Sequence, residues 1–147
     1  MFLEIIEEPI HFQLYGFATR VQKGRFGEAG MQLMNRMWRI VKATQTATTG
    51  INHWVYLPDK QMFVGIELSP NAKRPDLLEP LALELQRYLK HVHVGPYQAL
   101  PAKWASLKAE VANHGETMCS PSLEIYGHHC EDSSKLETTI LIGLKAK

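Results

Sequence analysis

One order of elements occurs twice in this 147-residue chain, and that duplication constrains the fold more than any single motif. In the first half, β-favouring residues predict a strand over 11–21. Apolar residues three and four positions apart predict a helix from 28 to about 47 that stops at 48–50. A turn then joins two short apolar strands over 52–57 and 61–68. The first half therefore reads strand, helix, strand, strand.

The second half repeats this order. Alternating side chains predict a strand over 89–94, followed by a helix that begins near Pro101 and ends at Gly115. Two further strands are predicted over 122–126 and 137–144. We therefore expect an α+β fold of two strand–helix–strand–strand repeats with antiparallel sheets, related by a pseudo-two-fold axis.

A polar connector separates the two halves. Residues 69–76 contain two prolines and mark the boundary, and the segment 77–87 is interpreted as a short helix or turn that links the halves. The first repeat then covers about 8–72 and the second about 86–146. Both repeats belong to a single domain over 1–147, a length that suits one compact unit.

A short sequence match supports the duplication. Residues 63–66 (FVGI) resemble residues 141–144 (LIGL), and each segment lies on the last predicted strand of its half. The match is brief, so the repeated order of elements gives it its weight.

Alternation across the strands predicts a groove. Side chains of a strand point to opposite faces in turn, so one face of each sheet is aliphatic and should lie under the helix, with Val55, Leu123 and Ile125 among its members. The other face carries aromatic rings and carboxylates, on Trp54, Tyr56, Phe63, Glu67, Glu124, Tyr126, Thr139 and Leu141. Two such faces, one from each half, would line a cleft between the repeats. In the alternative interpretation, these rings only cover the sheet or form a dimer contact.

An aromatic cleft that contains a carboxylate suits lipophilic or planar cations. The rings supply apolar area and cation–π attraction, and the carboxylate neutralises the charge of the ligand. We add Trp104 to the expected ligand-binding residues, although its helical phase with Leu100, Leu107 and Val111 favours a role in the core.

The chain resembles the GyrI-like family of effector-binding domains, which occur alone or fused to AraC-type and MerR-type transcription activators. In the second half the resemblance rests on 88–97 (YLKHVHVGPY), Trp104, 122–126 (SLEIY) and 137–144. In the first half it rests on 8–10 (EPI), Tyr56 and 64–67 (VGIE).

The resemblance implies two repeats about a pseudo-dyad, with a groove that takes varied lipophilic and often cationic compounds. Some relatives inhibit DNA gyrase or sequester toxins, and others hydrolyse strained small molecules with a Glu and a Tyr. Glu124 and Tyr126 stand where the family places its Glu-x-Tyr. Thr139 stands where multidrug-binding relatives carry a buried Glu, so Glu67, Glu124 or Glu137 would have to supply the charge.

Composition and charge narrow the range of partners. The chain has 16 Lys and Arg against 15 Asp and Glu, without a basic cluster, so we expect no direct binding to nucleic acid. No apolar run is long enough for a membrane span, and the acidic start of the chain argues against a secretory signal. These features predict a cytoplasmic protein in which Cys119 and Cys130 are free thiols.

The repeats use nearly every residue, so no helix-turn-helix is expected and a regulator would act through a separate partner. An exposed edge strand would allow a homodimer.

No metal or other cofactor is expected. Several potential metal ligands occur, namely His91, His93, His128, His129, Cys119 and Cys130, but the resemblance accounts for the histidine-bearing strand without a metal. We assign no catalytic residue, because Glu124 is better explained as a partner for a ligand amine than as a base. The leading hypothesis is a stand-alone module that binds or sequesters lipophilic, cationic or aromatic small molecules. The alternatives are a hydrolase that uses Glu124 and Tyr126, or a gyrase-inhibitor-like module that binds a protein.

Overall fold

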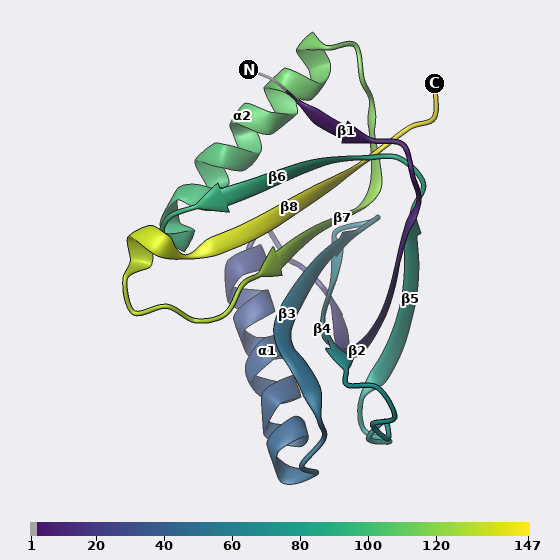
Figure 1. Ribbon diagram of the computed structural model, residues 1–147, viewed down its shortest axis with the longest axis vertical. Coiled ribbons are helices and arrows are strands. Elements are labelled where there is room, and N and C mark those ends of the chain that lie inside the picture. Colours follow the sequence, from purple (N-terminus) through teal and green to yellow (C-terminus); the bar gives the residue numbers. More distant parts are fainter. Residues whose placement is uncertain (1–2) are drawn as a thin grey trace.

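The computed structural model describes residues 3–147 and contains one antiparallel sheet flanked by two helices (Figure 1). The strands are β1 (Glu4–Ile6), β2 (Ile10–Arg20), β3 (Thr48–Leu57), β4 (Gln61–Leu68), β5 (Glu79–Leu85), β6 (Tyr88–Val94), β7 (Met118–Tyr126) and β8 (Glu137–Leu144). The helices are α1 (Phe26–Ala43) and α2 (Leu100–Asn113), with short 3-10 turns at Tyr97–Ala99 and Ser133–Lys135. The predicted α+β class is confirmed.

The strand order shows the predicted two-fold repeat. Across the sheet it is β1-β6-β8-β7-β3-β4-β2-β5, so each half presents equivalent strands in mirrored positions. Both hairpins even carry the same irregularity in register, between Thr48 and Asn52 in β3 and between Met118 and Ser122 in β7. Because β3 pairs directly with β7, the two half-sheets are continuous and form one eight-stranded sheet.

The short match between 63–66 and 141–144 does not follow this structural repeat. Asn52 pairs with Ile66, and the equivalent Ser122 pairs with Ile142, so the two isoleucines are equivalent. The sequence match instead sets Ile66 against Leu144, two residues further along. A shift of two residues keeps every side chain on the same face, which is why the two patterns look alike.

The strand that precedes each repeat pairs with the other half. β1 pairs with β6 of the second repeat, and β5, which precedes the second repeat, pairs with β2 of the first. The prediction of a helix or turn over 77–87 was therefore wrong. Leu81, Leu83 and Leu85 alternate along β5 and pack against the core, and pairing with β2 overrides the helical preference of the segment.

The first helix ends earlier than predicted, at Ala43 instead of about residue 47. Gln45 has a φ of 53° in the left-handed region, and the amide of Thr46 donates back to the carbonyl of Val41. These contacts terminate the helix. The expected stop at 48–50 is instead the beginning of β3.

Apolar side chains gather on both faces of the sheet. On the helix-bearing face, Phe17, Val64 and Ile66 of the sheet cluster with Leu33 and Met37 of α1. Leu89, Ile140 and Ile142 of the sheet cluster with Leu107 and Val111 of α2. The other face has its own cluster, formed by Leu14, Val55, Phe63, Leu85, Tyr88, Leu123 and Leu141. Figure 1 shows β5 running along the side of the molecule from one half to the other. The core therefore has two layers, one under the helices and one within the curved sheet.

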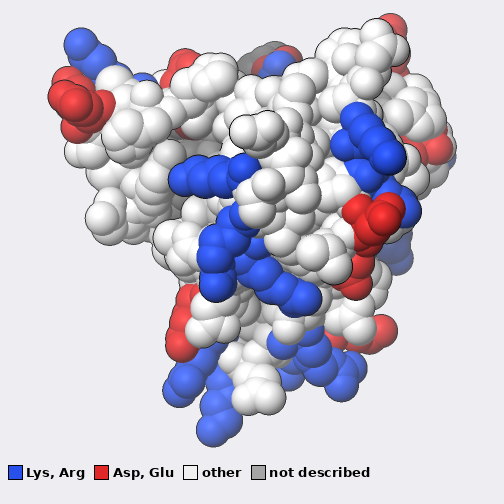
Figure 2. Space-filling view, turned by 90° about the horizontal axis from the view of Figure 1, so that it is seen from below, with Lys and Arg blue, Asp and Glu red and all other residues white. Residues whose placement is uncertain are grey.

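Basic side chains outnumber acidic ones on the face seen from below (Figure 2). Arg36, Arg39 and Lys42 are exposed on α1, which carries one acidic residue, Glu28. Within residues 3–147 no helix is both long enough and apolar enough to span a bilayer.

An ion-pair cluster centred on Arg87 links segments that are distant in the sequence. Its guanidinium donates from both terminal nitrogens to Glu116, at 2.6 and 2.8 Å, and from Nε to Glu7 at 2.9 Å. It also donates to the carbonyl of Lys145 at 3.3 Å. Three segments that are distant in sequence therefore meet at one buried arginine.

Stability should fall at acidic pH through this cluster. The two hydrogen bonds from Arg87 lower the pKa of Glu116 to about 2, below its ordinary value of about 4.5. Since the native pKa is depressed, the contribution is complete above the ordinary value and is lost as pH falls towards 2. We expect the free energy of unfolding, measured by urea titration, to decline over this interval in the wild type.

The decline should be shallower in Glu116→Gln. A matched control is Glu28→Gln, because Glu28 is an exposed residue of α1, and its profile should follow the wild type. Parallel profiles for wild type and Glu116→Gln would show that the pair does not control acid stability.

Candidate functional site

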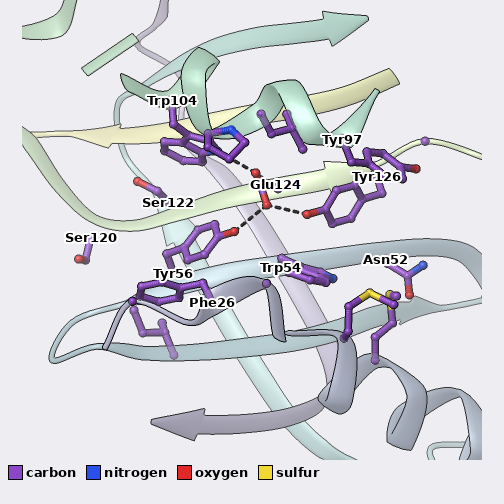
Figure 3. Close-up of a pocket in the computed structure, with 18 of the residues that line it drawn as sticks. Phe26, Asn52, Trp54, Tyr56, Tyr97, Trp104, Ser120, Ser122, Glu124 and Tyr126 are labelled. Atoms are coloured by element: carbon purple, nitrogen blue, oxygen red, sulfur yellow. Dashed lines mark hydrogen bonds between the residues drawn. The ribbon is translucent and has the colours of Figure 1, made fainter. Parts of the chain in front are cut away.

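A cavity of about 1060 Å³ lies over the central strands β3 and β7, between the two helices. Its polar and aromatic lining includes Phe26, Asn52, Trp54, Tyr56, Tyr97, Trp104, Ser120, Ser122, Glu124 and Tyr126 (Figure 3). Gly27, Met31, Met34, Leu100, Lys108, Met118, Cys119 and His129 are also part of the lining. This volume is at the upper end of the range for small-molecule sites.

The cavity remains open because each helix covers the outer strands of its own half. α1 packs on β2 and β4, and the apolar stripe of α2 packs on β6 and β8. The central pair β3–β7 is therefore uncovered on the helix-bearing face. Alternation brings every second residue of the two strands to the cavity, namely Asn52, Trp54 and Tyr56 from β3 and Ser122, Glu124 and Tyr126 from β7.

The predicted division of the sheet into an aliphatic helix face and an aromatic groove face was wrong. Trp54 pairs with Val64 and Glu124 pairs with Ile140, so the cavity residues share the helix-bearing face with aliphatic neighbours. Leu123, expected under the helix, lies in the opposite cluster. The chemical type of a side chain does not tell which face of the sheet it occupies. The pairing register between strands decides which residues of different strands share a face.

The structure brings together five of the nine residues expected to bind a ligand: Trp54, Tyr56, Trp104, Glu124 and Tyr126 line the cavity. The other four lie outside it. Phe63 and Leu141 are each 2% exposed in the opposite cluster, and Thr139 shares that face.

Glu67 is 45% exposed, and its Oε1 lies 3.2 Å from Nε2 of His53. Glu137, the alternative source of charge, is exposed at the start of β8. Of the three carboxylates considered from the sequence, Glu124 is the one that lines the cavity.

Glu124 is held by three hydrogen bonds from aromatic side chains (Figure 3). The hydroxyls of Tyr56 and Tyr126 both donate to Oε1 at 2.6 Å, and Nε1 of Trp104 donates to Oε2 at 2.7 Å. Glu124 is 4% exposed. All three donors are neutral, so they orient the carboxylate and stabilise its negative charge without cancelling it.

The two tyrosines keep their protons at neutral pH. Burial and the nearby Glu124 carboxylate raise the pKa of Tyr56 and of Tyr126 above the ordinary phenol value. Both therefore act as hydrogen-bond donors to Glu124. Among the ion pairs formed within residues 3–147, none involves Glu124.

Aromatic rings surround the carboxylate in edge-to-face contacts. Tyr56 contacts both Phe26 and Trp104, with centroids 5.4 and 5.7 Å apart, and Tyr126 contacts both Trp54 and Tyr97, at 5.4 and 5.3 Å. Each ring that binds Glu124 is thus braced by another ring. Trp104 serves both interpretations made from the sequence, because it lies on the apolar stripe of α2 and also binds Glu124.

Sequence reasoning missed three prominent cavity residues, Asn52, Phe26 and Tyr97. Asn52 lies two positions before Trp54 on the same strand, so alternation alone would have placed it on the same face. Phe26 begins α1, and Tyr97 lies in the turn before α2. No local pattern marks these two, because their positions depend on how each helix packs on the sheet.

The potential metal ligands are dispersed. His91 and His93 pair with Ile140 and Thr138 on the face that α2 covers, and Cys119 lines the cavity. Within the described residues no three His, Cys, Asp or Glu side chains are arranged to hold a metal ion. Cys119 and Cys130 are not joined in a disulfide.

No family model and no curated protein matches the sequence. Solved structures match its fold. SAV2435 bound to tetraphenylphosphonium is 14% identical with a TM-score of 0.68, covering 99% of this chain and 94% of that one. The EcmrR C-terminal domain is 15% identical with a TM-score of 0.74, covering 99% of both chains. A hydrolase from Listeria innocua is 13% identical with a TM-score of 0.57, covering 97% and 91%.

At these identities the matches establish the fold. This fold is the one that the resemblance to GyrI-like domains predicts.

Replacing Gly30 should disturb the wall of the cavity. A Cβ at Gly30 of α1 would overlap the ring of Trp54, so Gly30→Ala must displace the indole or the helix. We expect a loss of about 1–3 kcal/mol in the free energy of unfolding by urea titration. Gly27→Ala is the control, because a Cβ at Gly27 meets no atom within 4 Å, and it should be neutral or slightly stabilising. Equal effects of the two changes would contradict the packing described for Trp54.

Proposed function

We propose that this protein binds bulky lipophilic cations in the cavity between its repeats, as an effector-binding or sequestering domain. The observation that carries the proposal is the carboxylate of Glu124, buried among aromatic rings and held by three neutral donors. A buried charge is costly unless it is paired. A cation in the cavity would pair with it.

The cavity supplies the other contributions that such a ligand requires. Its rings offer apolar area and negative π faces to a desolvated cation. Its volume accommodates a ligand with several rings. A carboxylate has about four acceptor positions, and three are used, two on Oε1 and one on Oε2. A ligand N–H would therefore bind Oε2, whereas a fully substituted cation would be held by charge alone.

The electrostatic attraction for a cation comes from Glu124 inside the cavity and not from the overall charge of the molecule. The molecule has a formal charge of +1, and basic side chains outnumber acidic ones on the face shown in Figure 2. Lys108 lies on the cavity lining, with its ammonium 5.9 Å from the centroid of the Trp104 ring. Long-range steering therefore does not favour cations, and their selection depends on Glu124 after the ligand has lost water.

The similar structures support this assignment. SAV2435, which has the same fold, is bound to tetraphenylphosphonium, and the EcmrR C-terminal domain matches nearly all of this chain. We propose that this protein works without a DNA-reading segment of its own in residues 3–147, so any regulatory effect of ligand binding would pass to a separate partner.

Tetraphenylphosphonium should bind in the cavity and quench tryptophan fluorescence in a saturable way, since Trp54 and Trp104 line it. Glu124→Gln should weaken binding about ten- to hundredfold, because the charge partner is lost. The matched control is Glu67→Gln, which removes a carboxylate outside the cavity and should leave the affinity unchanged. Circular dichroism would verify that both variants are folded.

Tetraphenylborate provides a second measurement on the wild type, because it has nearly the shape of tetraphenylphosphonium and the opposite charge. We expect it to bind far more weakly. Similar affinity for the two ions, or the absence of saturable quenching by tetraphenylphosphonium, would overturn the proposal.

A further inference from the structure

An unpartnered hydrogen-bond donor lies in the wall of the cavity, away from the groups that hold Glu124. Nε1 of Trp54 is buried, and among residues 3–147 it has no hydrogen-bond acceptor. Burial of an unsatisfied N–H is unfavourable, so an acceptor that reaches it gains more than one at an exposed site. The indole N–H can only donate, so its partner must be an oxygen or another acceptor.

Asn52 adds a second donor on the same wall. Nε1 of Trp38 donates to Oδ1 of Asn52 at 2.7 Å. An indole N–H binds only an acceptor, so this contact fixes the orientation of the amide and turns its NH₂ group away from Trp38. Asn52 lines the cavity two residues before Trp54, so both side chains lie on the same face of β3.

The pairing register places the residues that carry these donors beside the acidic residue. Trp54 lies directly opposite Glu124 on the neighbouring strand, and Asn52 lies on the diagonal. The Cβ atoms of opposite and diagonal residues in an antiparallel pair are about 5 to 8 Å apart. The cavity therefore has an acceptor end at Glu124 and a donor end at Trp54 and Asn52 (Figure 3).

We propose that the donor end is an acceptor subsite, and that the physiological ligand is a cation that also carries a carbonyl, ether or hydroxyl oxygen. This inference rests on the proposed binding of cations and narrows their class. A plain hydrocarbon cation would satisfy Glu124 and leave the Trp54 N–H without a partner.

Flexible methionine side chains line the same cavity as Trp54. Met34 of α1 lines the cavity and packs against the cluster that contains Trp54, and Met31 lines it nearby. Methionine side chains are unbranched and repack readily. A ligand oxygen would reach Nε1 of Trp54 by displacing side chains of this wall.

The test compares two probes of equal charge and nearly equal shape, (4-acetylbenzyl)triphenylphosphonium and (4-isopropylbenzyl)triphenylphosphonium. Only the first carries a carbonyl oxygen. We expect it to bind about three- to tenfold more tightly to the wild type by calorimetry. Whatever its effect on overall affinity, Trp54→Phe should bind the two probes equally, whereas Glu67→Gln should keep the preference.

Wild-type spectra give an independent measurement. The indole N–H resonance of Trp54, assigned by its loss in Trp54→Phe, should shift downfield with the acetyl probe more than with the isopropyl probe. Equal affinities together with equal shifts would overturn the acceptor subsite and leave cation binding intact. Failure of both probes to bind would overturn cation binding and the subsite together.

Discussion

The antiparallel pairing of β3 with β7 is the contact on which the rest of the molecule depends. It joins the two repeats into one sheet, and it sets Trp54 directly opposite Glu124. Each helix covers the outer strands of its own half, so this pair forms the floor of the cavity. A change in this register by one residue would turn Glu124 away from the helices and remove both the carboxylate and its donors from the cavity.

The cavity owes its shape to the symmetry of the repeats and its polarity to a departure from that symmetry. Trp54 follows Asn52 by two residues, as Glu124 follows the equivalent Ser122, so a neutral indole and a carboxylate occupy related positions. One side of the cavity consequently presents the Trp54 N–H, which has no acceptor within residues 3–147, and the other presents a negative charge held by phenol and indole groups. Two related halves thus provide a site with two chemically different ends.

In the proposed function, burial gives the Glu124 carboxylate its selectivity for cations. In water a single charge attracts a cation weakly, whereas a low-dielectric site strengthens the same attraction several-fold. The aromatic rings exclude water and brace one another, so Glu124 keeps its orientation while the ligand varies. The carboxylate is held rigidly, whereas the methionines of α1 in the cavity wall can repack. This combination suits cationic ligands of different shapes.

Much of this protein is determined by patterns that are local in sequence. Helical spacing and strand alternation predicted both helices, the hairpins and the duplication, and Glu124 with its aromatic neighbours was among the residues expected at the site. The faces of the sheet, the strand over Glu79–Leu85 and the place of Glu67 outside the cavity were decided by tertiary structure. Alternation tells which residues of one strand share a face. Which strands pair, and in what register, depends on contacts between distant segments, and those contacts alone set Glu124 beneath Trp104 and between two tyrosines.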